Sequence, residues 1–165
     1  MNDLNETEYY FREALPSDMD KIFEWANDPQ VRANAFNTEP IPYENHVKWY
    51  NRILADDEVL QYIFVSKKVI DGNIITEDIG QIRLNVEDTA AFIDYSIAPN
   101  LRGKGLGSKM LRALVDMLEQ NKNQFDRLIG QVKYTNIASA LAFTKCGFQK
   151  EEQEDFLQFV YKLRH

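Results

Sequence analysis

Apolar and polar residues follow two periodicities along this chain, and the changes from one to the other predict its elements. Short runs that alternate or are continuously apolar are typical of strands, and they occur at residues 9–15, 60–66, 79–86, 91–97, 127–134, 148–151 and 156–163. Apolar residues three and four positions apart are typical of helices, and they occur at residues 17–26, 43–56, 106–121 and 136–146. The predicted order is therefore β-α-α-β-β-β-α-β-α-β-β.

The boundaries of the first helix carry their own signals. Ser17 is a good N-cap residue and predicts where the helix begins. Asn27-Asp28-Pro29 predicts where it ends, because proline disfavours a helical conformation in the residue before it. Residues 30–42 are then predicted to form a loop, and Asp71-Gly72-Asn73 predicts a hairpin turn further on.

The stretch that organises the chain runs from residue 92 to residue 111. An apolar strand is closed by Pro99, and three glycines at alternate positions lead into the long helix. Arg102 and Lys104 stand among these glycines. Free amides and the helix dipole at such a turn favour an anion, most often a phosphate, although a glycine-rich turn with no ligand has the same local pattern.

The glycine spacing separates the possible phosphate ligands. No window supplies the P-loop spacing, and Ser108 stands where a dinucleotide fingerprint needs a third glycine. Arg102-Gly103-Lys104-Gly105-Leu106-Gly107 matches [QR]-x-x-G-x-[GA], and in this strand-to-helix context it resembles the acyl-CoA motif of the GCN5-related N-acetyltransferases (GNAT family). A second element, from Asn136 to Gly147-Phe148, resembles the later helix of the same family. The resemblance covers residues 9–163.

This resemblance implies a fold, a cofactor and a cofactor site. The fold is an α/β (α+β) mixed, mostly antiparallel central sheet with helices on both faces. The cofactor is acetyl-CoA, and its thioester is attacked directly by a primary amine. The implied cofactor-binding residues are Ser96 and Ile97 for the pantetheine arm, Asn136 and Ser139 on its other side, and Arg102, Gly103, Lys104, Gly105, Leu106, Gly107 and Ser108 for the pyrophosphate. A side chain at 105 or 107 is expected to obstruct the phosphate or the backbone angle.

The catalytic residues are less clear, because two positions depart from the family pattern. Phe143 stands where many relatives have a tyrosine that acts as acid, and Ala91-Phe92 stands where many have a glutamate that acts as base. Asp94 and Tyr95 are the nearest titratable groups and are the predicted catalytic residues, with Glu87 or His46 able to reach in from neighbouring elements. Each also has a structural interpretation as a packed residue or a hydrogen-bond partner. A non-catalytic acyl-CoA-binding module or a mononucleotide-binding domain are the competing interpretations.

The amino-terminal third indicates the acceptor. Trp25-Ala26-Asn27-Asp28-Pro29-Gln30-Val31-Arg32 and the aromatic residues after it resemble a branch that acts on nucleotide-linked amino sugars, as in pseudaminic acid biosynthesis. In this interpretation Arg32 pairs with a diphosphate, and Phe36, His46 and Trp49 line the acceptor site. A related branch acetylates ribosomal-protein N-termini, so a peptide acceptor remains open, and the aromatic residues could instead belong to the core.

Composition narrows the class of protein. The chain has 165 residues, of which 44% are apolar, and this predicts one domain at residues 9–165 after a flexible N-terminus at residues 1–8. A net charge of −7 argues against non-specific nucleic-acid binding. The two histidines and the single Cys146 predict no metal site and no internal disulfide. We therefore expect a cytoplasmic monomer or homodimer that binds neither membrane nor nucleic acid.

Overall fold

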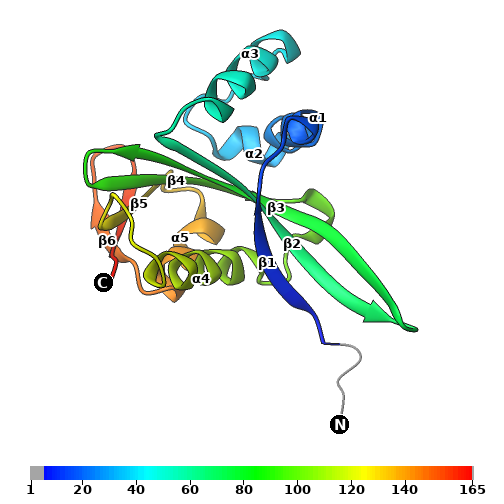
Figure 1. Cartoon of the computed structure of the whole chain (residues 1–165). Helices are drawn as coiled ribbons and strands as arrows, with labels where there is room; N and C mark the ends of the chain where they lie inside the picture. Colours follow the sequence, from blue (N-terminus) through cyan, green and yellow to red (C-terminus); the bar gives the residue numbers. More distant parts are fainter. Residues whose placement is uncertain (1–5, 165) are drawn as a thin grey trace.

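The computed structural model describes residues 6–164, which form a seven-stranded sheet in the order β1-β2-β3-β4-β5-β7-β6 (Figure 1). Neighbouring strands are antiparallel except β4 and β5, which are parallel. The strands are β1 (Glu8–Glu13), β2 (Val59–Ile70), β3 (Asn73–Glu87), β4 (Ala90–Ile97), β5 (Arg127–Val132), β6 (Gln149–Glu152) and β7 (Leu157–Lys162). The predicted mixed, mostly antiparallel sheet is confirmed.

Helices cover both faces of this sheet (Figure 1). The helices on one face are α1 (Met19–Ala26), α2 (Pro29–Asn34) and α3 (Tyr43–Leu54), and those on the other are α4 (Leu106–Glu119) and α5 (Ile137–Lys145). Two single turns of 3-10 helix, Pro16–Asp18 and Pro99–Leu101, precede α1 and follow β4. The apolar face of α4 packs into the larger of two cores, while α1 and α3 pack through Trp25 and Tyr50 into the smaller one. Within residues 6–164, no helix combines the length and the apolar character needed to cross a bilayer.

Helix α2 occupies part of the segment that was predicted to be a loop. The Asp28 side chain accepts hydrogen bonds from the backbone amides of Gln30 and Val31, at 3.1 and 3.2 Å, so it caps α2 at its N-terminus. Pro29 follows as the first residue of the helix, where a missing N–H costs nothing. The Asp-Pro pair therefore ends one helix and begins the next, and only the first of these meanings was predicted.

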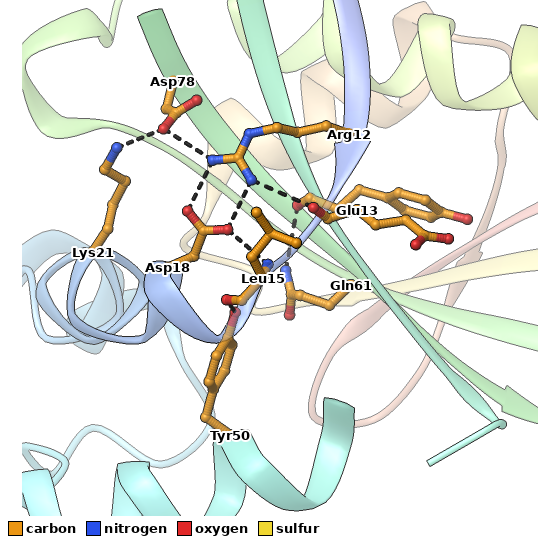
Figure 2. Close-up of polar contacts among 9 residues, drawn as sticks. Arg12, Glu13, Leu15, Asp18, Lys21, Tyr50, Gln61 and Asp78 are labelled. Atoms are coloured by element: carbon orange, nitrogen blue, oxygen red, sulfur yellow. Dashed lines mark hydrogen bonds and ion pairs between the residues drawn. The ribbon is translucent and has the colours of Figure 1, made fainter. Parts of the chain in front are cut away.

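The predicted N-cap at Ser17 is wrong, because Asp18 holds this turn. The Asp18 carboxylate accepts a hydrogen bond from the Leu15 amide at 2.8 Å and two from the Arg12 guanidinium at 2.7 and 2.8 Å (Figure 2). Arg12 also donates to Asp78 of β3 at 3.1 Å. A charged acceptor at residue 18 thus joins β1, the turn before α1 and the middle of the sheet.

The hairpin of β2 and β3 is longer than predicted. Its ladder continues to the pair Ile70 and Asn73, and the predicted turn has Asp71 and Gly72 in the left-handed region, with φ of 51° and 79°. Most of its outer residues are exposed and extend beyond the neighbouring strands (Figure 1). The apolar residues of this segment stand in adjacent pairs, Val69-Ile70 and Ile74-Ile75, and do not alternate with polar ones, which explains why the sequence underestimates this hairpin.

The feature that positions the site is the separation of β4 from β5. Their parallel pairing covers only residues 90–93 of β4 and residues 127–130 of β5. Strand β4 then continues to Ile97 and β5 to Val132 without pairing to each other. The backbone of residues 94–97 therefore keeps one edge open in the middle of the sheet.

Candidate active site

A cavity of about 760 Å³ lies where β4 and β5 separate. It reaches from the turn before α4 to helices α2 and α3, so segments far apart in sequence form one site. Its lining includes the predicted residues Arg32, Phe36, His46, Trp49, Asp94, Tyr95, Ser96, Ile97, Arg102, Gly103, Gly105, Leu106, Gly107, Ser108, Asn136 and Ser139. Of the predicted residues, Lys104 is exposed and does not line the cavity, and neither does Glu87, the alternative base.

The glycine loop has the geometry of an anion cradle. Gly103 and Gly105 have φ of 77° and 73°, which only glycine adopts without strain, and Gly105 is the N-cap of α4. The amides of the first turn of α4 therefore face a position that no side chain at 105 occupies. Gly107 has no positive φ, and a Cβ there would lie 3.5 Å from the Tyr95 ring, an ordinary contact. The expected backbone constraint thus applies at 105 and is wrong for 107.

Arg102 lies beside this loop and is already paired. Its guanidinium forms an ion pair with Asp28, the cap of α2, and donates to the Gln30 side chain at 3.3 Å. Arg102 therefore connects the loop before α4 to the helix on the opposite wall of the cavity.

The Tyr95 hydroxyl is a hydrogen-bond donor on the part of β4 that has an open edge. Its hydroxyl lies 2.8 Å from the Ser139 hydroxyl, and either oxygen can donate. Burial raises the pKa of Tyr95 to about 12, against the opposing effect of this hydrogen bond. Asn136 caps α5 as predicted, its side-chain oxygen accepting from the Ser139 amide at 3.3 Å. Phe143, in the position of the missing tyrosine, is buried and packs edge-on against Tyr95.

Asp94 provides the negative charge of the cavity lining. Its side chain is 55% exposed and forms an ion pair of 3.3 Å with Arg83 of β3. The Arg83 guanidinium lies 4.9 Å from the centre of the Trp49 ring, so an aromatic surface, a cation and a carboxylate stand side by side.

Two predicted acceptor residues have structural partners. The His46 Nε2 lies 2.8 Å from the Met19 carbonyl, and burial lowers the pKa of this imidazole, which favours the neutral form with its hydrogen on Nε2. The Arg32 guanidinium donates to the carbonyls of Ala26, Asn37 and Glu39, at 2.7, 3.0 and 3.3 Å. Both side chains shape the wall of the cavity through these bonds.

Sequence reasoning missed several polar residues that line the cavity, among them Gln81, Arg83 and Gln131. Gln81 and Arg83 are two positions apart on β3, so they face the same side of the sheet. Polar residues at alternate positions of an otherwise apolar strand were the available signal. Their spacing points to one polar side of β3 in the site.

Comparison with known proteins identifies the family of the chain. The acetyltransferase (GNAT) domain family matches residues 9–149. Comparison with the curated proteins gives no significant match.

Solved structures share the fold at low sequence identity. A domain from Methanocaldococcus jannaschii DSM 2661 is 18% identical, with a TM-score of 0.79 over 96% of this chain and 100% of that one. The aminoglycoside acetyltransferase AAC(6')-Ib, in complex with coenzyme A and kanamycin, is 20% identical, with a TM-score of 0.74 over 94% and 95%. Spermidine N-acetyltransferase from Vibrio cholerae, in complex with CoA and spermine, is 17% identical, with a TM-score of 0.74 over 93% and 95%.

The family match spans most of the chain, and its motif residues form the glycine loop at the open edge of β4. The chain therefore belongs to the acetyltransferase (GNAT) domain family and is an N-acetyltransferase that uses acetyl-CoA.

Proposed function

We propose that the separated strands hold acetyl-CoA, with its pyrophosphate on the amides of residues 103–108 and its pantetheine arm along residues 94–97 of β4. The observation that carries this proposal is the open backbone edge of β4, which leads from the glycine loop into the cavity. The amide groups of the pantetheine arm can pair with this edge as an added strand does. Asn136 and Ser139 at the start of α5 stand on the other side of the arm.

Tyr95 is the proposed acid. The neutral acceptor amine attacks the thioester carbonyl carbon, and backbone amides near residues 95–97 stabilise the oxyanion that forms. As the tetrahedral intermediate collapses, the C–S bond breaks and the thiolate takes the Tyr95 phenol hydrogen, while the nitrogen of the new amide loses its extra proton to water. Ser139, 2.8 Å away, can donate to the Tyr95 oxygen and so stabilise the phenolate that is left.

Asp94 is the proposed partner of the acceptor amine. Its carboxylate lines the cavity and is half exposed, so an ammonium group can reach it. The ammonium must lose one hydrogen before attack, and a carboxylate can accept it directly or through water.

The proposed acceptor is a nucleotide-linked amino sugar, for example a UDP-linked 4-amino sugar. Trp49 and the 58% exposed Phe36 offer surfaces on which a ring can stack. Arg83 stands beside Trp49 and can meet a phosphate, whereas Arg32 is bonded to backbone carbonyls. The alternative acceptor is a peptide N-terminus, as in the ribosomal-protein acetyltransferase RimL, a structure that also shares the fold at 15% identity and a TM-score of 0.74.

The proposal also includes the cellular compartment and the oligomeric state of the enzyme. A single, half-buried thiol at Cys146 suits a reducing compartment, so we place the enzyme in the cytoplasm. We predict that the enzyme acts as a monomer or a homodimer.

The experiment measures thiol release from acetyl-CoA with three amines: a UDP-linked 4-amino sugar, a short peptide with a free N-terminus, and spermidine. We expect the highest kcat/KM with the amino sugar. A higher kcat/KM with the peptide or with spermidine would overturn the proposed amino-sugar acceptor, and so would the absence of thiol release with all three amines.

The role of Tyr95 is tested by Tyr95→Phe. We expect kcat to fall about 100-fold while the Kd for CoA stays unchanged. Ser139→Ala, which removes the supporting hydrogen bond, should lower kcat about tenfold. Tyr10→Phe, on an exposed tyrosine of β1, is the matched control and should leave kcat unchanged. An unchanged kcat in Tyr95→Phe would remove this residue from the mechanism.

A further inference from the structure

A second, smaller cavity of about 380 Å³ lies against the first three turns of α4. Its lining is Gly105, Ser108, Lys109, Arg112, Ala113, Asp116 and Lys145. Gly105 and Ser108 also line the large cavity, so the two cavities meet at the glycine loop. A ligand whose pyrophosphate occupies that loop can therefore extend into both.

Three cations dominate the charge of this smaller cavity. Lys109 and Arg112 stand one turn apart on α4, and Lys145 ends α5. Arg112 donates to the Lys145 backbone carbonyl at 3.2 Å, which joins α4 to the end of α5, and both residues line the cavity. The Lys109 ammonium lies 4.7 Å from the centre of the Tyr9 ring, so β1 holds it beside the cavity.

The one carboxylate of the cavity is at its distant end. Asp116 lies one turn after Arg112 and two turns after Lys109, further from the glycine loop along α4. The charge next to the loop is thus positive, and it adds to the positive end of the helix dipole. This combination suits a second phosphate group, separate from the one that the glycine loop binds.

We propose that the cavity of Lys109, Arg112 and Lys145 binds the ribose 3′-phosphate of CoA. This inference rests on the proposed position of the pyrophosphate at residues 103–108. CoA carries a phosphomonoester on the ribose next to its pyrophosphate, at the end opposite the thiol. With the pantetheine arm on β4, that end leaves the glycine loop on the side where the small cavity opens. The chain then distinguishes CoA from 3′-dephospho-CoA, which lacks only this phosphate.

The experiment compares the Kd values of CoA and 3′-dephospho-CoA by titration calorimetry. For the native chain we expect CoA to bind about tenfold more tightly, and this ratio to decrease as NaCl is raised, because the three cations are exposed to solvent. In the double variant Arg112→Gln, Lys145→Gln the ratio should approach one. The Kd of 3′-dephospho-CoA should stay as in the native chain, which also reports that the variant is folded.

The matched control is the double variant Arg127→Gln, Lys162→Gln. It removes the same two positive charges from an exposed cross-strand pair beside the start of β4, the end of that strand opposite the glycine loop. This control should keep the tenfold preference. Equal Kd values for the two ligands in the native chain, or an equal loss of preference in both double variants, would overturn the inference. If the native chain binds neither CoA nor 3′-dephospho-CoA, the proposed cofactor site itself is contradicted.

Discussion

Arg102 and Asp28, which are 74 residues apart in sequence, form an ion pair that joins the loop before α4 to the start of α2. The same Asp28 carboxylate oxygen accepts the amides of Gln30 and Val31 at the start of α2. One side chain therefore caps α2, which lines the proposed acceptor side of the cavity, and forms an ion pair with the arginine of the glycine loop motif. The two halves of the site are joined through this carboxylate.

Replacing Asp28 should separate its two roles. Asp28→Ala loses the cap and the ion pair, and we expect the free energy of unfolding to fall by about 2 kcal/mol. Asp28→Asn keeps an oxygen that can cap α2 and loses only the charge, so about half of that loss is expected. Urea denaturation of both variants measures the difference. Equal losses would mean that the cap contributes nothing.

The sequence predicted the part of the site that depends on local backbone geometry. Gly105 must adopt a positive φ to begin α4, and Asn136 must cap α5, so residue type and spacing were sufficient for both. The fold class followed from the order of the elements and from the family motif. Helix α2 was missed because it is shorter than two turns and begins at Asp28-Pro29, which was interpreted only as the end of α1.

The contacts that the sequence did not predict join segments that are distant in sequence. Tyr95 and Ser139 meet across 44 residues, and Arg83 meets both Asp94 and Trp49. No local pattern encodes such contacts, since each residue alone also suits a packed strand or helix. The same holds for Arg12 of β1, whose partner Asp78 lies 66 residues away on β3.

Stability in acid should depend on Asp18 (Figure 2). The Arg12 guanidinium holds the pKa of Asp18 below its ordinary value, although burial acts in the opposite direction. A carboxylate with a lower pKa in the folded state stabilises fully above its unfolded pKa of about 4, and this contribution is lost as pH falls through the folded value.

The variant Asp18→Asn measures this contribution. At pH 7 we expect a loss of about 2 kcal/mol in the free energy of unfolding, because the bonds to a charged acceptor disappear. Below pH 4 the difference between native chain and variant should shrink toward zero. Urea denaturation between pH 3 and pH 7 provides the test. A difference that stays constant over this range would contradict an ionised Asp18.

Gly130 should tolerate no side chain. A Cβ at this position of β5 would lie 2.3 Å from the Phe143 ring, which is itself packed against Phe148 and Phe159. We expect Gly130→Ala to lower the free energy of unfolding by about 2 kcal/mol through overpacking. The double variant with Phe143→Leu should lose less than the sum of the two single variants, because the smaller side chain makes room. Additive losses would contradict the contact.

A substitution at Gly105 can distinguish an effect on cofactor binding from an effect on the stability of the fold. Gly105→Glu places a carboxylate where the pyrophosphate is proposed to bind, so the Kd for CoA should rise about 100-fold or more. Open space surrounds the added Cβ, and the cost to the fold is therefore limited to backbone strain at φ of 73°, about 1–2 kcal/mol. Gly72→Glu is the matched control, because Gly72 also has a positive φ, 79°, and open space, and it lies in the hairpin turn. Both variants should lose similar stability in urea denaturation, and only Gly105→Glu should lose CoA binding. If both keep the native Kd, the glycine loop does not bind the pyrophosphate.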